Sequence, residues 1–420
     1  MAKLKMKPKK PASKQDAAPR TAADAVIDAV RKAHPKIHFS RASEWEKTRI
    51  RYSTGFLGLD VKTGGGLCGG RIHQYAGKTR SCKTSAAYHA CATAQQTLID
   101  PRILWLHTEP FEKDWARRCG VQIAYDDVEI KMLEQRNGKP FTPAEKVELK
   151  RQVGTFQNMM STTDHEDLLE AGLDALRTGD YHLFVVDSIG ALHPNVWEEK
   201  TLGEPVQMGR HAMMVKRWAK KLENVIARKR VAVLALNHVR SDMDTHALIF
   251  PGGVDWGHYV DLNVVWKQDA WIHPASKKKD DEEDAPPETT ERPTCNAEDE
   301  AVGQLAFWKI DKTKIGGVRS SFGRVRFYFQ DYGKFKAGDW DLVRDALDTG
   351  VEVGVIDARG GGNYYIAGTE TKLGRGMDDV RAYVERNPAF MRKLYDTIAH
   401  HLAVQSVASP KVSASRDEEK

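Results

Sequence analysis

The chain contains few cysteines and no long apolar run. Its 420 residues include five cysteines, at positions 68, 82, 91, 119 and 295, and their spacing fits neither a zinc site nor a disulfide framework. No apolar stretch approaches the roughly 20 residues that a membrane helix needs. No apolar segment follows the basic N-terminus, which argues against a secretory signal. These absences predict a cytoplasmic protein, in a reducing compartment, that has no membrane partner.

The net charge is also small, +6 at pH 7, but it is unevenly distributed. Residues 1–20 are rich in lysine and proline and predict a disordered basic tail. A lysine triplet and an acidic run, residues 280–284, lie in a low-complexity segment within a predicted insertion over 269–302. The polar residues 405–420 predict a second disordered tail.

Apolar runs typical of buried strands alternate with helical stretches. The strand candidates are residues 71–76, 103–107, 181–186 and 231–236. A basic amphipathic helix over 208–230 connects the last two. This alternation predicts an α/β fold with a mainly parallel sheet. Ligands of such sheets bind beyond the carboxyl ends of the strands, where this chain places Glu109, Asp187 and Asn237-His238.

The remaining segments predict additions to this core. Residues 45–70 are glycine-rich and predict irregular structure, residues 126–160 predict a helical surface insertion, and residues 304–330 alternate as strands do, with a break at Gly316-Gly317. After residue 335, two helical stretches (340–347 and 377–404) and a short strand (364–366) predict a small C-terminal α/β domain. The predicted organisation is an N-terminal helix and linker (21–44), a core (45–334) with insertions at 126–160 and 269–302, and a C-terminal domain (335–404).

One motif indicates the chemistry. It is an altered phosphate-binding loop, made of Gly77, Lys78, Thr79, Arg80, Ser81, Cys82, Lys83, Thr84 and Ser85. The usual pattern is G-x-x-x-x-G-K-[ST], and Cys82 replaces its second glycine. Backbone N–H groups and Lys83 would bind phosphates, and the Thr84 hydroxyl would hold Mg²⁺. A cysteine β-carbon is unfavourable where such a loop needs positive φ, so a chance basic turn is the alternative.

Further motifs, in the same order and spacing, resemble those of the bacterial RecA family of DNA strand-exchange ATPases. The similarity covers residues 21–404 apart from the two insertions. Its pieces are Ser53-Thr54-Gly55, Leu59-Asp60, Gly65-Gly66-Leu67, Gly70-Arg71-Ile72, Val185-Val186-Asp187-Ser188, Leu192-His193-Pro194, Met208-Gly209, Asn237, Arg240, Gly252-Gly253 and Lys312-Thr313-Lys314-Ile315. The resemblance implies a RecA-type ATPase core that binds ATP and Mg²⁺.

The resemblance also implies roles for single residues. Glu109 would polarise the water that attacks the γ-phosphate, although Glu112 is nearly equivalent on sequence alone. Asp187 would hold Mg²⁺ with Thr84, or it is simply a strand-end cap. Trp115 would stack on adenine, or it is an ordinary half-buried tryptophan. His238 stands where the family has a glutamine that reads the γ-phosphate.

Two lysines match the pair that reaches the nucleotide of a neighbouring subunit. They are Lys312 and Lys314, and a solvated strand face explains their spacing equally well. Gly257 and His258 replace a Lys-Phe pair that meets the same nucleotide. Together with Cys82, these departures bear on ATP turnover more than on the fold.

Two loops, at about 195–208 and 241–251, would bind DNA by the same resemblance. Phosphate charge would come from basic residues near them, for which a solvated helix face is the alternative. Apolar side chains would insert between bases, and two glycines would let the backbone approach phosphates. The candidates are Arg210, Arg217, Lys220, Lys221, Arg240, Met208, Leu248, Ile249, Gly252 and Gly253.

The sequence therefore predicts a DNA-dependent ATPase and recombinase. It would form a helical homo-oligomeric filament on single-stranded DNA and pair it with double-stranded DNA. One alternative is a filament or accessory protein of the same fold with weak or absent ATP hydrolysis, which Cys82, His238 and Gly257 favour. A ring-forming helicase is another, against which the helix at 22–34, the C-terminal domain and the lysine pair argue.

Overall fold

The computed structural model describes residues 22–34, 50–198, 201, 204, 209–241, 248–274, 289–293, 301–316 and 321–406. The chain forms two compact units, which divide between Arg49 and Ile50. The first contains α1 (Ala22–Ala33), an amphipathic helix with an acidic first turn and a basic last turn, as the helix dipole favours. The predicted basic tail and most of the predicted C-terminal tail lie outside the described residues.

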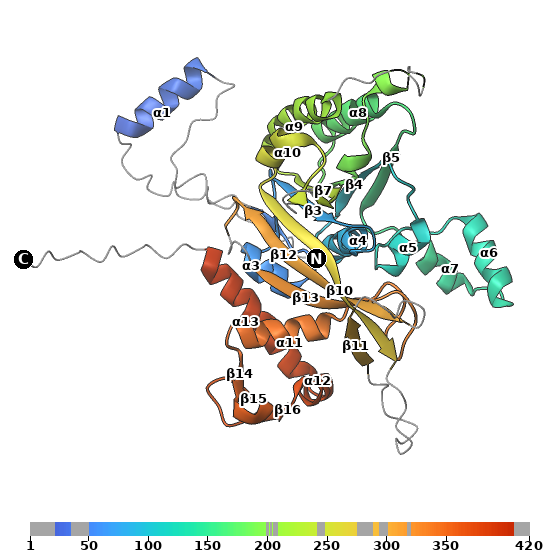
Figure 1. The fold of residues 1–420 in the computed structure, drawn as a ribbon, viewed down its shortest axis with the longest axis vertical. Coiled ribbons are helices and arrows are strands. Elements are labelled where there is room, and N and C mark those ends of the chain that lie inside the picture. The colour runs from blue at the N-terminus through green and yellow to red at the C-terminus, as the bar shows by residue number, and fades with distance from the viewer. Residues whose placement is uncertain are drawn as a thin grey trace, which may run out of the picture. The chain divides into compact units, whose positions relative to one another are not determined.

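The second unit is built on a nine-stranded sheet (Figure 1). Six neighbouring strands are parallel, in the order β5 (Thr155–Met160), β4 (Arg102–His107), β6 (Leu183–Asp187), β7 (Ala232–His238), β3 (Ile72–Gly77) and β10 (Leu262–Pro274). Antiparallel strands continue the sheet beyond β10, namely β12 (Gly303–Thr313), β13 (Phe322–Tyr328) and, paired with β10, β11 (Thr289–Pro293). The predicted α/β fold with a mainly parallel sheet is confirmed.

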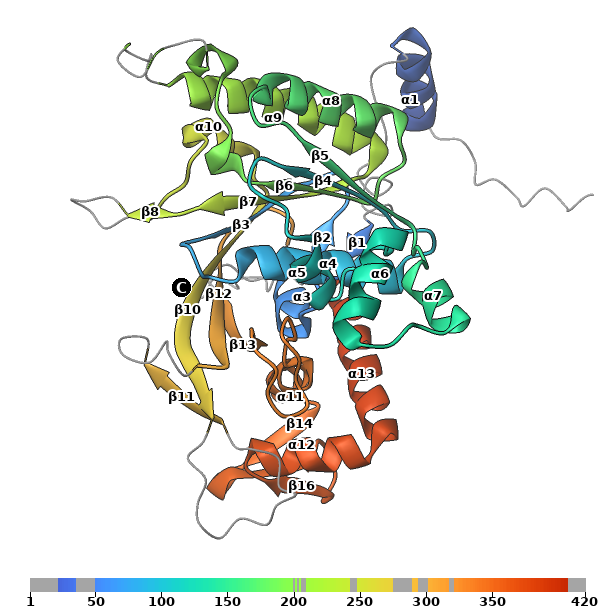
Figure 2. The same cartoon turned by 90° about the vertical axis from the view of Figure 1, so that its right-hand side faces the viewer.

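Helices cover both faces of this sheet (Figure 2). One face carries α4 (Lys83–Thr97) and α5 (Lys113–Arg118), and the other carries α8 (His165–Thr178), α9 (Arg210–Lys229) and α10 (Gly253–Tyr259). Because strand residues alternate in direction, Trp105 and Leu106 of β4 enter opposite hydrophobic clusters. β3, β4, β6 and β7 are parallel, so their carboxyl ends meet at one edge.

The predicted insertion at 126–160 is helical only in part. It contains α6 (Asp127–Asn137) and α7 (Pro143–Leu149), which project from the edge of the sheet in Figure 1. Residues 155–160 instead form the edge strand β5, paired with β4. Its sequence, TFQNMM, is half-buried to exposed and lacks the apolar run that reveals an inner strand.

The glycine-rich segment at 45–70 is not wholly irregular, so that prediction was wrong. It contains β1 (Arg51–Tyr52), α3 (Leu57–Thr63) and β2 (Leu67–Cys68). Gly64 ends the helix with a φ of 71°, and buried Leu59 anchors it in the core. Likewise, residues 269–274 of the second predicted insertion continue β10, whereas its centre lies outside the described residues apart from β11.

The C-terminal part has the predicted α/β composition. It contains α11 (Leu342–Glu352), α12 (Met377–Arg386), α13 (Pro388–Ser406) and a small sheet of β14 (Ile356–Arg359), β15 (Asn363–Ile366) and β16 (Lys372–Arg375), with a short 3₁₀ turn, η3 (Gly360–Gly362). These elements share their own apolar cluster. The single helix predicted over 377–404 is two helices, separated at Asn387 because Pro388 disfavours helical backbone before it. The domain boundary at residue 335 stays a prediction.

The described part of the chain bears on two sequence expectations, which concern membrane-spanning helices and disulfide bonds. None of its helices combines the length and apolar character of a membrane span. The four cysteines at positions 68, 82, 91 and 119 are free thiols.

Candidate nucleotide site

The altered phosphate loop connects β3 to α4, as its sequence predicts. Cys82 has φ 63° and ψ 10°, the left-handed conformation that favours glycine, and Arg80 has φ 66°. The loop therefore keeps a backbone suited to glycine although a cysteine occupies the position. Gly77 is required at its start, since a β-carbon there would lie 2.2 Å from Ser81 Oγ.

The Cys82 side chain is braced from the far end of the chain. The Gln304 amide on β12 donates to the Cys82 sulfur and to the Arg80 carbonyl, the latter at 3.0 Å. The residue also packs against the apolar cluster that contains α4. Burial raises the pKa of the Cys82 thiol above its usual value, so the thiol is neutral at physiological pH. Sequence reasoning missed Gln304, which no local motif marks.

Two buried polar atoms of this edge have no hydrogen-bond partner among the described residues. They are Ser81 Oγ in the loop and Asn237 Oδ1 at the end of β7. In addition, Cys82 makes no side-chain cap on α4, so the first-turn N–H groups face the loop uncapped. Lys83 is the first residue of this helix, and it is largely buried. A phosphate chain fits the Ser81 hydroxyl, the first-turn N–H groups and Lys83, all of which can donate, whereas Asn237 Oδ1 accepts and needs a donor such as water.

Asp187 at the end of β6 shares its surroundings with Lys83. Burial, and then the charge of Glu109, raise the pKa of Asp187 to about 7, against the opposing effect of Lys83. Burial also lowers the pKa of Lys83, although the charges of Asp187 and Glu109 resist this. The three ionisable groups thus lie within electrostatic reach of one another at one strand edge.

Glu109 lies at the centre of this edge, where three strands end. Its Oε1 accepts from Ser188 Oγ at 2.6 Å and lies 3.2 Å from His238 Nε2. Burial alone would raise the pKa of Glu109, but the contacts with Ser188 and His238 and the charge of Lys83 outweigh it and lower the pKa. Glu112 is instead exposed, at the start of α5, so the structure separates the two glutamates that the sequence left equivalent.

The described residues contain no group of three or more His, Cys, Asp or Glu side chains arranged to hold a metal ion. A Mg²⁺ ion at this edge would therefore share its coordination between phosphate oxygens, the Thr84 hydroxyl and Asp187. This pattern is usual for Mg²⁺, which keeps waters and phosphate oxygens and takes one or two protein ligands.

A pocket of about 420 Å³ adjoins the loop. Aromatic side chains line it beside the loop residues 80–85, and they are Trp115, Trp271, Phe327 and Phe329. Trp115 Nε1 lies 3.3 Å from Ser85 Oγ, and its ring meets the Phe327 ring edge-on. The pocket has the size and aromatic walls that suit a purine base. Of these rings the sequence singled out only Trp115; Phe327 lies near the end of β13 (Phe322–Tyr328) and Phe329 just after it.

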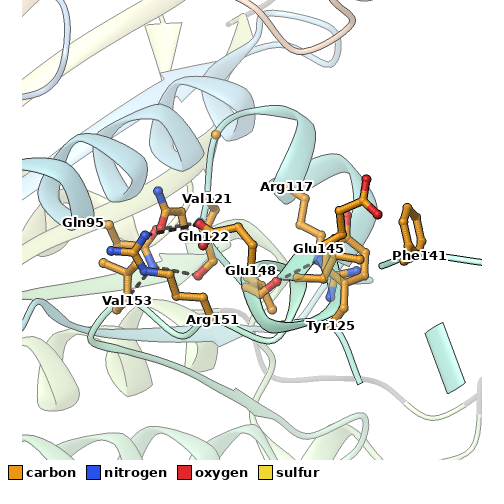
Figure 3. Close-up of a pocket in the computed structure, with 13 residues that line it drawn as sticks. Gln95, Arg117, Val121, Gln122, Tyr125, Phe141, Glu145, Glu148, Arg151 and Val153 are labelled. Carbon is orange, nitrogen blue, oxygen red and sulfur yellow. Dashed lines mark hydrogen bonds and ion pairs between the residues drawn. The ribbon is translucent and has the colours of Figure 1, made fainter. Parts of the chain in front are cut away.

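A larger pocket, of about 630 Å³, lies away from the loop, between α4 and the α6–α7 insertion (Figure 3). Several of its polar lining groups already have partners within the chain. Gln95 pairs with the backbone of Gln122 and donates to the Val153 carbonyl. Arg117 forms an ion pair with Glu129 and stacks on the Tyr125 ring at 3.5 Å. These contacts attach the insertion to the core.

The predicted lysine pair lies at the end of β12. Lys312 donates to the Gly257 carbonyl and Lys314 to the His258 carbonyl, both at the C-terminal end of α10. Burial lowers the pKa of Lys312, and the neighbouring charge of Lys314 lowers it further. Within the protomer the two ammonium groups therefore satisfy helix carbonyls, as lysines near a helix C-terminus do.

The predicted DNA-binding residues divide into two groups. Those of the second loop lie around a hairpin of β8 (Arg240–Ser241) and β9 (Leu248–Ile249), with Leu248 and Ile249 exposed. Gly252 and Gly253 have positive φ, and Gly253 lies against Ala212 near the start of α9. Met208, most of the first loop after the short η2 (Asn195–Trp197), and residues 242–247 lie outside the described residues.

The α9 candidates are spread along the helix. Arg210 begins it, beside the second loop, while Arg217 and Lys220 are exposed two to three turns further on. Lys221 forms an ion pair with Glu170 of α8, which offsets its charge. Arg210 is therefore the α9 candidate nearest in sequence to Ala212, which lies against Gly253.

Comparison with known proteins gives one consistent result. No family model matches the chain. It is similar to curated proteins named "Protein RecA": 24% identical over 400 residues to that of Nitratidesulfovibrio vulgaris, covering 94% of each chain. It is 26% identical over 388 residues to that of Zymomonas mobilis, covering 91% of this chain and 90% of the relative. It is 25% identical over 386 residues to that of Methylobacterium radiotolerans, covering 90% of this chain and 87% of the relative.

Proposed function

Because the chain is a divergent RecA-like protein, we propose that it is an ATP-dependent DNA recombinase. Protomers would assemble into a helical filament on single-stranded DNA and pair it with a homologous duplex in the cytoplasm. The observation that carries the proposal is the meeting of Glu109, Ser188 and His238 from three strand ends beside Lys83. This arrangement supports the proposal because ATP hydrolysis uses a carboxylate close to the phosphate-binding lysine.

Each residue would have a defined task. Lys83 and the first-turn N–H groups of α4 would bind the phosphates, and Thr84 and Asp187 would hold Mg²⁺, which offsets phosphate charge. Glu109 would orient the attacking water and take its proton through Oε2, because Ser188 and His238 both contact Oε1. The lowered pKa of Glu109 keeps it ionised for this role.

The adenine pocket and the neighbouring subunit would complete the proposed site. Trp115 and the other aromatic rings of the 420 Å³ pocket would hold adenine. Lys312 and Lys314 would leave the α10 carbonyls to reach the phosphates of an adjacent protomer, on which α1 would dock. Arg210, Arg240 and the glycines before α10 would contact DNA phosphates, and Leu248 and Ile249 would insert between bases.

DNA-stimulated ATP hydrolysis tests this function. Lys83→Ala is expected to abolish turnover, because the lysine is the main cation of the phosphate site. Lys139→Ala, an exposed lysine on the insertion, is the matched control and should leave turnover unchanged. Negative-stain images with single-stranded DNA should show filaments.

The accessory-protein alternative predicts a different result. Undetectable hydrolysis in the wild type, with filaments and DNA binding intact, would support a structural filament and would contradict the enzyme. Rings in place of filaments would contradict the recombinase as well.

A further inference from the structure

A buried network of side-chain amides joins the nucleotide edge to the base of the second loop. Its centre is Gln74 on β3, which is only 2% exposed. Gln74 Oε1 accepts from Asn237 Nδ2 at 3.0 Å and from Trp256 Nε1 at 2.6 Å. Its Nε2 donates to Asn263 Oδ1 at 2.9 Å, and Asn263 in turn donates to Asp311. The side-chain hydrogen bonds of Gln74 within the described residues are to Asn237, Trp256 and Asn263, none of which belongs to the phosphate loop or to β8 and β9.

Both ends of the second loop are tied to this one glutamine. Asn237 immediately precedes His238, which contacts Glu109. The second N–H of Asn237 donates to the Pro251 carbonyl at 2.9 Å, directly after β9. Trp256, fully buried on α10, lies just beyond Gly252 and Gly253. The strand that enters the loop and the helix that leaves it therefore share a single acceptor, Gln74 Oε1.

The network also contains a group that can respond to nucleotide. Asn237 Oδ1 is buried and has no partner among the described residues, and it lies at the edge assigned to phosphate. A donor or a bridging water that arrives with the nucleotide would reorient this amide. Since the opposite end of the same amide bonds to Gln74 and Pro251, such a reorientation changes the contacts of both. A packed, hydrogen-bonded network of this kind has discrete arrangements rather than continuous ones.

We propose that Gln74 is a positioning residue that couples nucleotide binding to the geometry of the second loop, through its hydrogen bonds to Asn237 and Trp256. The proposal rests on the proposed function, in which that loop contacts DNA. Nucleotide binding itself, and DNA binding without nucleotide, do not depend on these bonds. The measurable quantity is therefore a ratio, the affinity for single-stranded DNA with a non-hydrolysable ATP analogue divided by the affinity without it.

Trp256→Phe is the sharpest perturbation, because it removes the indole N–H and keeps an aromatic ring. Trp218→Phe is its matched control: Trp218 stacks on Trp256 in the same cluster, but its buried N–H has no partner among the residues that the structure describes. Fluorescence anisotropy with a labelled oligonucleotide gives both affinities. We expect Trp256→Phe to lower the ratio about fivefold, equivalent to about 1 kcal/mol, while Trp218→Phe leaves it unchanged.

Two substitutions of Gln74 provide a second measurement. Gln74→Met has a similar shape and removes both hydrogen-bonding atoms, so it should abolish most of the coupling. Gln74→Glu keeps an acceptor for Asn237 and Trp256 but loses the N–H that donates to Asn263, so it should retain more of the coupling than Gln74→Met. Affinity for the ATP analogue should stay within about twofold of wild type in all four variants, which separates positioning from direct binding.

Several results would overturn the proposal. A ratio in Trp256→Phe equal to that of wild type, or an equal fall in Trp218→Phe, would show that packing and not the hydrogen bond matters. Loss of coupling in Gln74→Glu as complete as in Gln74→Met would refute the role of the acceptor. A wild-type ratio of one would instead refute nucleotide-controlled DNA binding, and with it both this proposal and the proposed function.

Discussion

The backbone strain at Cys82 can be isolated by two substitutions. Cys82→Ala keeps a β-carbon at φ 63°, whereas Cys82→Gly removes it, and both lose the sulfur that Gln304 contacts. The difference between the two variants therefore reports the cost of a side chain in the left-handed conformation. Residue size and flexibility alone would predict the opposite order of stability, because alanine is closer in size to cysteine and glycine is the more flexible residue.

The expected magnitudes follow from the geometry. Loss of the partly buried sulfur costs each variant about 1 kcal/mol. A β-carbon in the left-handed region costs about 1–2 kcal/mol, and glycine loses about 0.4–1 kcal/mol through the entropy of the unfolded chain. Cys82→Ala should thus be destabilised by about 1 kcal/mol. Cys82→Gly should be more stable than Cys82→Ala by about 0.5–1 kcal/mol and close to the wild type.

Urea unfolding can be monitored through the fluorescence of the buried tryptophans. The difference in stability then appears as a shift in the midpoint urea concentration, with the slope of the free energy of unfolding against urea concentration unchanged. The unfolding curves should be recorded without nucleotide, so that binding does not add to stability. An alanine variant at least as stable as the glycine variant would refute the reasoning, since the loop would then bear no strain at residue 82.

Three further predictions concern the site and its surroundings. Trp115→Ala should weaken ATP binding about tenfold through lost stacking, and equilibrium titration with a fluorescent ATP analogue would contradict this if the affinity did not change. Glu109→Gln should lower kcat by about 10²–10⁴ with nucleotide affinity retained, whereas near-normal turnover in steady-state assays would exclude Glu109 as the base. Burial raises the pKa of Asp345 to about 7, so the native state keeps a proton that the unfolded chain releases. The free energy of unfolding then falls by up to about 1.4 kcal/mol per pH unit as pH rises from about 4 to 7. Asp345→Asn should remove that part of the slope and leave the parts due to Asp60 and Asp187, whose pKa values are raised to about 6 and about 7. An unchanged slope in urea unfolding between pH 5 and 7 would contradict this.

Much of the fold could be predicted because its signals are local. Inner strands such as β4 and β6 are short apolar runs, and their alternation with helices implies a parallel sheet. The edge strand β5 and the buried helix α3 escaped prediction for a common reason. Their stability comes from pairing and burial against distant residues, and their own composition reads as polar or glycine-rich.

The site shows the same division. The phosphate loop, Asp187 and Glu109 were candidates because each follows a strand, and parallel strands end together. The choice between Glu109 and Glu112 needed the contacts with Ser188 and His238, which come from other strands. Gln304 and Trp271 could not be found in this way, because each acts on a loop about two hundred residues earlier in the chain.

The sequence by itself determined that a loop with the spacing of a phosphate-binding motif follows a strand of a parallel sheet, since spacing and periodicity are properties of neighbouring residues. It also revealed that the loop departs from its pattern at Cys82. Only the tertiary structure decided that the departure is tolerated: the residue adopts a left-handed conformation, and Gln304 on β12 braces its sulfur. Such compensation depends on contacts between segments far apart in the chain, and no local pattern encodes it.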